Sequence, residues 1–469
     1  MVFSSTVFLF TFLPLVLLIC YLCPARWRNG FLLAASLIFY GWGEPRYIVI
    51  MAASILFNYG CGLAIDRIKV KHKSPRLMLA FSVAGNLLIL GYFKYADFFI
   101  ENINQLVGTS LALLQLTLPI GISFYTFQAM SYVIDVYRGK ARPQHNILDF
   151  ATYITLFPQL IAGPIVRYVT IEEQLKSREY SLEQTAEGVR RFIIGLGKKV
   201  LLANQAGLLY TEIAAMDLQQ LPAVTAWLGA IAFTFQIYFD FSGYSDMAIG
   251  LGKMLGFDFL ENFNYPYISK SITDFWRRWH ISLSTWFKEY LYIPLGGNRR
   301  GLGRQCLNIM IVWALTGFWH GASWNFLWWG LYFGLLLILE KVWLLKYLTR
   351  LPAWAQHLYA LLLIVFGWVI FAEGAGMDFL AYFKAMSGLG GFADQRSLYF
   401  LLTGGISLCL MALASTPLPK RAADRCLDRM TGRPLLYVAV KNSFFLLVLL
   451  LSTAFLVSDT YNPFLYFRF

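Results

Sequence analysis

Residues 305–339 contain no Asp, Glu, Lys or Arg. This run is longer than the roughly 20 apolar residues that a helix needs to cross a bilayer. Largely uncharged runs recur along the whole chain, at residues 4–23, 29–43, 47–65, 77–93, 111–134, 192–211 (interrupted by two lysines), 222–239 extending to about 250, 351–372, 397–415 and 437–458. Only 14% of the 469 residues are charged, against about 25% in soluble proteins. The sequence therefore predicts an all-α polytopic membrane protein with about ten to twelve transmembrane helices.

The net charge of +13 comes largely from basic residues in the short loops between the apolar runs. The loop 66–76 carries five of them, and the positive-inside rule predicts that it is cytoplasmic. Parity then places residues 253–304 in the cytoplasm and both termini in the periplasm. The lipid bilayer accounts for the positive charge, so no nucleic-acid partner is predicted.

We expect a single integral-membrane domain over residues 1–469, with a catalytic core at about 150–340 and a C-terminal tail at 459–469. Residues 157–164 contain two prolines and a glycine within an uncharged run, which predicts a re-entrant segment lining a cavity. Residues 271–304 open with Ser271-Ile-Thr-Asp274, a capping box, and then repeat aromatic residues at helical spacing. This pattern predicts an amphipathic helix over about 274–290 at the membrane interface.

His320 stands within the longest uncharged run, and an ionisable group at that depth usually lines a pathway or does chemistry. Two glycines flank it, Gly317 and Gly321, so a tightly packed helix interface is the alternative. Ser323 and Asn325 make the segment locally polar. A neutral imidazole in such a pocket can take a proton from a hydroxyl group.

His280 lies in the predicted amphipathic helix, on the same face as Arg277, while Asp274 is spaced to pair with Arg278. Its alternative role is an interfacial histidine beside lipid headgroups. Asp240, Tyr244 and Asp246 end an earlier apolar run. Buried carboxylates need partners, so we expect Asp240 and Asp246 to pair with basic or hydroxyl groups, with Arg277 and Arg278 as candidate partners, and to shape the site.

No metal site or bound cofactor is predicted, because the five histidines form no ligand-spaced pair and the phosphate- and dinucleotide-binding glycine motifs are absent. A histidine without a protein nucleophile suits direct acyl transfer, in which a base deprotonates an acceptor hydroxyl that attacks a thioester.

Three segments carry a resemblance to a known family: Trp276-Arg-Arg-Trp-His280, Tyr290-Leu-Tyr-Ile-Pro-Leu-Gly-Gly297 and Gly317-Phe-Trp-His-Gly321. They are similar to the conserved blocks of the membrane-bound O-acyltransferases, and residues 157–168 and 239–246 resemble the branch that acetylates bacterial polysaccharides. The resemblance implies helices around a central tunnel, with His320 catalytic and His280 as the second polar position. Trp276, Trp319, Arg277 and Arg278 belong to the same blocks and would shape the site.

The resemblance further implies an O-acetyltransferase of the bacterial inner membrane that takes acetyl from a cytoplasmic donor, acetyl-CoA. The acceptor would be an exopolysaccharide such as alginate or cellulose. Final transfer would need a periplasmic esterase-like partner and other polysaccharide biosynthesis subunits. The tail 459–469 resembles acyl-relay tails in which a tyrosine carries the acyl group, which here would be Tyr466; an aromatic anchor at the interface is the alternative.

Two other classes of protein share some of these features. A transporter also uses an intramembrane histidine and broken helices, although the chain has no internal repeat. A non-catalytic scaffold of a polysaccharide secretion complex would need neither histidine for assembly.

Overall fold

The computed structural model describes residues 1–161, 163–372, 378–430, 432–458 and 464–465. Within them every regular element is a helix, which confirms the all-α class. The first half contains α1 (Leu13–Leu22), α2 (Ala25–Gly41), α3 (Ile48–Val70), α4 (Arg76–Val107), α5 (Ile122–Arg138), α6 (Ile147–Thr155), α7 (Phe157–Leu160), α8 (Tyr168–Lys176), α9 (Leu182–Gly197), α10 (Asn204–Ala214) and α11 (Ala223–Met254). The second half contains α12 (Ile272–Arg278), α13 (Ile281–Phe287), α14 (Leu302–His320), α15 (Trp324–Leu339), α16 (Leu345–Leu348), α17 (Ala353–Phe371), α18 (Phe379–Met386), α19 (Gln395–Ala414), α20 (Leu418–Asp428) and α21 (Pro434–Ser458).

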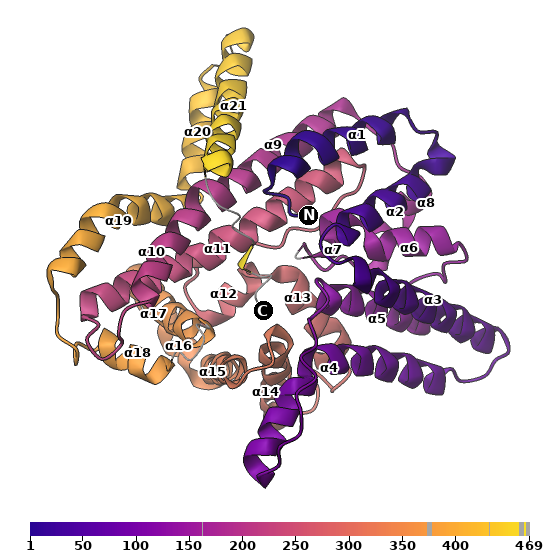
Figure 1. Cartoon of the computed structure of the whole chain (residues 1–469), viewed down its shortest axis with the longest axis horizontal. Helices are drawn as coiled ribbons and strands as arrows, with labels where there is room; N and C mark the ends of the chain where they lie inside the picture. The colour runs from indigo at the N-terminus through magenta and orange to yellow at the C-terminus, as the bar shows by residue number, and fades with distance from the viewer. Residues whose placement is uncertain (162, 373–377, 431, 459–463, 466–469) are drawn as a thin grey trace.

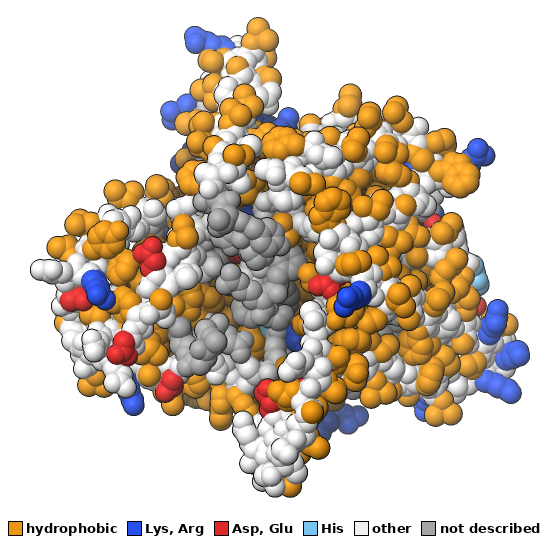
Figure 2. All heavy atoms as spheres, viewed as in Figure 1, with side chains coloured by type: hydrophobic (Ala, Val, Ile, Leu, Met, Phe, Trp, Pro, Cys, Tyr) orange, Lys and Arg blue, Asp and Glu red, His pale blue; other side chains and the backbone are white. Residues whose placement is uncertain are grey.

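The described residues include seven helices that are long and apolar enough to cross a membrane: α3 with the turn before it, α4, the helix that runs from α9 into α10, α11, α17, α19 and α21. Phe8–Leu22 forms a shorter apolar helix. Apolar side chains cover most of the face shown in Figure 2. The chain is therefore a multi-pass membrane protein, while the count of ten to twelve crossings stays a prediction.

The helix that runs from α9 into α10 and the long helix α11 lie side by side through the middle of the molecule (Figure 1). Glycines allow α9 and α11 to approach closely, since a Cβ atom on Gly188 would lie 2.6 Å from the carbonyl oxygen of Gly250. Helices α1 to α8 lie on one side of this central group, and α12 to α18 lie on another (Figure 1). Helices α20 and α21 project from the rest of the molecule (Figure 1), with part of α21 packed against α9.

The predicted break at residues 157–164 is present, because α7 is a single short helix between irregular segments. A serine supplies part of the missing backbone pairing: the Phe157 N–H donates to Ser36 Oγ at 3.1 Å. The continuous helix predicted over 274–290 is wrong. Helix α12 ends at Arg278 and α13 begins at Ile281, because His280 takes a left-handed conformation with φ of 45° and ψ of 54°. Trp276 and Trp279 are buried in the protein rather than at an exposed face.

Candidate active site

His320 is the last residue of α14, which forms a tight hairpin with α15. The uncharged run 305–339 is thus divided between two helices, while its predicted two membrane crossings stay a prediction. A Cβ atom on Gly317 would overlap the carbonyl oxygen of Phe326 and would lie 3.2 Å from the Cα atom of Gly330. The glycines therefore permit close packing of the two backbones, and that packing fixes where α14 ends and where His320 lies.

The end of α14 is capped by side chains from α4. The Lys94 ammonium donates to the carbonyl oxygens of Trp319 at 2.6 Å and His320 at 3.0 Å. The Tyr95 hydroxyl donates to the carbonyl oxygen of Phe318 at 2.7 Å. The last carbonyls of a helix have no partner within it, and a cation there also opposes the negative end of the helix dipole. The polypeptide at His320 is therefore held by α4 as well as by α15.

His280 is 1% exposed and caps the start of α13 from the turn between α12 and α13. Its Nδ1 lies 3.2 Å from Asn262 Oδ1. The same oxygen accepts from the backbone N–H of Ser282 at 3.1 Å and from Ser282 Oγ at 2.9 Å. A non-glycine residue in the left-handed region is uncommon and needs support from its surroundings, which these bonds provide.

Two cavities meet at His320. The first, here called the basic cavity, has a volume of about 230 Å³, and its lining includes Arg277, His280, Lys288 and His320. The second, here called the tail cavity, has a volume of about 20 Å³, room for about one water molecule. His320 also lines the tail cavity, together with Asp240, Trp368 and Leu465. One imidazole can therefore contact molecules in either cavity.

Trp319 packs between the two histidines. Its ring centroid lies 6.3 Å from that of His280 and 5.1 Å from that of His320. Trp276 lines the basic cavity. Ser323 precedes α15, and neither it nor Asn325 lines either cavity. The polar groups that hold the two histidines are instead Asn262, beside His280, and Lys94, at the His320 carbonyl, and sequence reasoning missed both.

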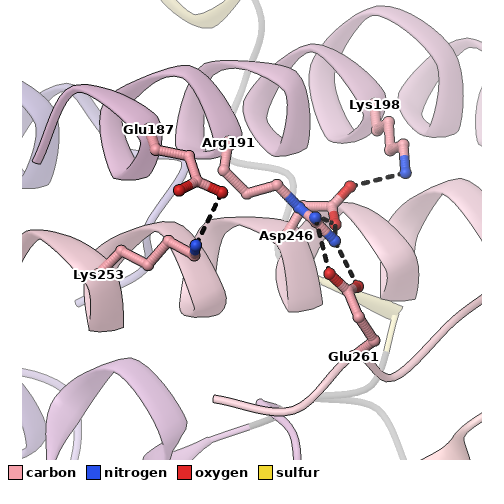
Figure 3. Close-up of polar contacts among 6 residues, drawn as sticks. All are labelled: Glu187, Arg191, Lys198, Asp246, Lys253 and Glu261. Atoms are coloured by element: carbon pink, nitrogen blue, oxygen red, sulfur yellow. Dashed lines mark hydrogen bonds and ion pairs between the residues drawn. The ribbon is translucent and has the colours of Figure 1, made fainter. Parts of the chain in front are cut away.

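The two carboxylates on α11 pair with basic groups, as expected, but the candidate partners Arg277 and Arg278 are wrong. Asp240 pairs with Lys199 at 2.6 Å, and both side chains are 4% exposed. Asp246 pairs with Arg191 and with Lys198, each at 2.6 Å. Figure 3 shows that these basic residues reach Asp246 from α9 and from the π-helical turn that follows it. These basic residues lie on the helix that precedes α11 in the sequence. They reach the carboxylates because α9 and α11 lie side by side.

The neighbours of Arg277 and Lys288 are already paired. Asp274 binds Arg278 at 2.9 Å, as its spacing predicted, and Glu289 binds Lys140 at 3.2 Å. Partial burial acts to raise the pKa of the Glu289 carboxyl, but the nearby cations, Lys140 first and then Arg167 and Lys288, outweigh it and lower that pKa. Within the part of the chain that the structure describes, neither Arg277 nor Lys288 makes an ion pair. The basic cavity is thus lined by two cations available to an anion.

Part of the C-terminal tail reaches the tail cavity. Phe464 is 1% exposed; its ring packs edge-on to Tyr244 at 4.9 Å, and the Lys199 ammonium lies 4.8 Å from its centre. The Leu465 N–H donates to Asp240 at 2.7 Å. Tyr466 lies outside the described residues. Lys199, Asp240 and Tyr244 therefore form the seat for residues 464–465.

The model of the membrane-bound O-acyltransferase family matches residues 140–372. The chain is 41% identical to the probable alginate O-acetylase AlgI of Pseudomonas putida over the full length of both proteins. It is 44% identical to that of Pseudomonas aeruginosa, over 88% of this chain and 81% of the relative. The chain belongs to the membrane-bound O-acyltransferase family. A peptidoglycan O-acetyltransferase of Helicobacter pylori is 35% identical over 83% of this chain and 80% of its own length.

Membership of this family makes the protein an acyltransferase. The matched range includes His280, His320 and every residue listed above for the basic cavity, but it excludes Lys94 and the tail. The described residues contain no cluster of three or more His, Cys, Asp or Glu suited to a metal.

Proposed function

We propose that this acyltransferase takes acetyl from acetyl-CoA at the cytoplasmic face of the inner membrane and passes it to an acceptor on the periplasmic side. The end product would be an O-acetylated exopolysaccharide such as alginate or cellulose. The observation that carries the proposal is the position of His320, which lines both the basic cavity and the tail cavity. A single base can then serve a donor held on one side and an acceptor that enters from the other.

Charge supports the assignment of the basic cavity to the donor. Its lining comes from residues 273–337, and its basic part falls in the segment 253–304 that the charge bias places in the cytoplasm. Arg277 and Lys288 have no carboxylate partner among the described residues. Guanidinium and ammonium groups are the usual ligands of phosphates. Coenzyme A carries phosphates at one end and the thioester at the other, so its acetyl group would point toward His320.

His320 would act as the general base. The imidazole takes the proton of an acceptor hydroxyl, whose oxygen attacks the thioester carbonyl to form a C–O bond. The C–S bond then breaks, and the coenzyme A thiolate leaves and takes up the proton held by the imidazole. General-base catalysis of this kind contributes about 10²–10⁴-fold to the rate. No cofactor is needed for the proton and electron balance.

The seat of the tail supports an acyl relay. Leu465 lines the cavity that His320 also lines, and Tyr466 is the next residue in the chain. The tyrosine hydroxyl would be the acceptor, and a periplasmic esterase-like partner would move acetyl from it to the polysaccharide. If the tail is only an aromatic anchor, the partner or polymer hydroxyl would enter the tail cavity directly.

The test uses purified protein in proteoliposomes with isotope-labelled acetyl-CoA. Free coenzyme A and the mass of the C-terminal peptide are measured for wild type, His320→Ala and Tyr466→Phe. The proposal expects coenzyme A release that requires His320 and an acetylated peptide that requires Tyr466. Release that survives Tyr466→Phe would keep the transferase and remove the relay. If wild type releases no more coenzyme A than His320→Ala, even when the periplasmic partner and the polymer are supplied, the proposed reaction with acetyl-CoA is contradicted.

A second arm tests the donor site. The double variant Arg277→Gln/Lys288→Gln should raise the KM for acetyl-CoA, but not that for S-acetyl-N-acetylcysteamine, a thioester that lacks phosphates. The matched control is Lys140→Gln, which removes a nearby cation that is already paired with Glu289 and does not line the cavity. An equal rise in both KM values would assign Arg277 and Lys288 to something other than phosphate binding.

A further inference from the structure

We propose that Asn262 is a positioning residue that fixes the proton of His280 on Nδ1. His280 then presents an unprotonated Nε2 to the basic cavity, where it accepts a hydrogen bond from an N–H or O–H group of a substrate. The inference rests on the proposed function for the identity of that substrate. The assignment of the tautomer rests on geometry alone.

The orientation of the Asn262 amide is settled by a backbone group. The Ser282 N–H can only donate, and the atom 3.1 Å from it is Oδ1 of Asn262. His280 Nδ1 lies 3.2 Å from the same oxygen. Because an amide oxygen can only accept, the ring nitrogen that faces it must carry the hydrogen. A neutral imidazole holds one proton, so Nε2 is left with a lone pair.

The Nε2 atom of His280 is buried and has no hydrogen-bond partner within the described part of the chain. Buried polar atoms are nearly always paired, so each exception calls for a ligand or a water molecule. His280 lines the basic cavity together with His320. With its lone pair on Nε2, His280 cannot donate to the oxyanion of a tetrahedral intermediate. It can accept from the amide N–H groups of the coenzyme A arm or from the attacking hydroxyl.

The segment that carries Asn262 is held on both sides. The Ile281 N–H donates to the carbonyl oxygen of Asn262 at 3.0 Å, and the Asn264 N–H donates to that of Arg278 at 2.9 Å. On the other side, Arg191 binds both carboxylate oxygens of Glu261, at 2.9 and 2.6 Å. Figure 3 shows the same guanidinium reaching Asp246. The amide oxygen is therefore fixed before a substrate arrives.

The first measurement is ¹⁵N NMR of histidine-labelled protein in lipid, without substrate. The chain has five histidines, and the His280 signals are assigned by their loss in His280→Gln. We expect a protonated Nδ1 and a bare Nε2 in wild type and in Asn262→Asp, whose carboxylate still accepts. Asn262→Leu should move the proton toward Nε2. Ser282→Ala keeps the backbone donor and should leave the tautomer unchanged.

The second measurement is the rate of coenzyme A release by the same variants. Asn262→Leu should lose about 10²-fold, the cost typical of a misplaced catalytic geometry, and Asn262→Asp should recover most of it. A higher KM for acetyl-CoA in Asn262→Leu would assign the Nε2 contact to the donor arm. A lower kcat would assign it to the attacking hydroxyl. A merely structural asparagine would not switch the tautomer.

Several results would overturn the proposal. One is a wild-type His280 that carries its proton on Nε2, which needs no variant to detect. Another is an Asn262→Leu protein with the wild-type tautomer or the wild-type rate. If wild type releases no coenzyme A, the proposed function fails, while the NMR measurement still decides whether Asn262 sets the ring.

Discussion

Replacement of Lys94 by Met should loosen the end of α14 and slow acyl transfer. The change leaves the carbonyl oxygens of Trp319 and His320 without their donor. An unpaired buried carbonyl costs about 1–3 kcal/mol, so the two together cost about 2–6 kcal/mol before the gain from no longer desolvating an ammonium is subtracted. His320 is the last residue of α14, so the loss of these two hydrogen bonds destabilises the helix end that positions its imidazole. A displacement of about 1 Å there would lower the rate roughly 10²-fold.

The assay combines coenzyme A release in proteoliposomes with hydrogen exchange of the backbone. Lys94→Met should speed exchange in the last turn of α14 and the start of α15, but not in α9. Lys94→Arg, which can still donate to two carbonyls, should retain more activity. Tyr95→Phe removes only the bond to Phe318 and should have a smaller effect. Wild-type rate and unchanged exchange in Lys94→Met would refute the reasoning.

Three further predictions concern stability. Gly317→Ala should destabilise the α14–α15 hairpin by about 1–3 kcal/mol through overpacking. Gly303→Ala should not, because Gly303 lies on the same helix with open space around it. Equal thermal unfolding temperatures for the two variants would contradict this. Asp240→Leu breaks the buried pair with Lys199 and should cost about 3–5 kcal/mol, part of which Lys199→Met should restore in the double variant. Glu289→Gln should cost less than about 1 kcal/mol, because Lys140 is exposed. Since the folded pKa of Glu289 is lowered, this contribution is present above the ordinary glutamate pKa of about 4.3 and is lost as the pH falls below that value and through the lowered folded pKa, as an unfolding series against pH would show.

The helical class and the break at residues 157–164 could be predicted, because a bilayer restricts both the composition and the backbone of a chain that crosses it. A charge-free run such as 305–339 has no stable alternative to helix in lipid, and the prolines at 158 and 164 cannot lie within an unbroken helix. The family blocks then pointed to His280 and His320, which the structure places around the same cavity. Sequence spacing also identified the Asp274–Arg278 pair, since both residues lie within one helix.

The partners of buried groups could not be predicted, because they come from distant helices. Asp240 was expected to bind an arginine downstream, yet Lys199, which precedes it by one helix, lies closer. The break at His280 was missed because helical spacing continues through the sequence 274–290, and a left-handed histidine has no sequence signal comparable to glycine. Asn262 lies in an irregular segment without a motif. A buried asparagine before a tryptophan-rich block is the only hint that could have been used.

The polar groups around the site follow a single rule, that a charge taken out of water must be paired or must face a ligand. Lys199, Lys198 and Arg191 are each neutralised by a carboxylate on α11 or beside it. Lys94 has no carboxylate partner in the described chain and binds the carbonyls at the end of a helix instead. Arg277 and Lys288 fit neither pattern, and they line the cavity that ends at both histidines. Under the proposed function, the missing half of each ion pair would be a phosphate of the acyl donor.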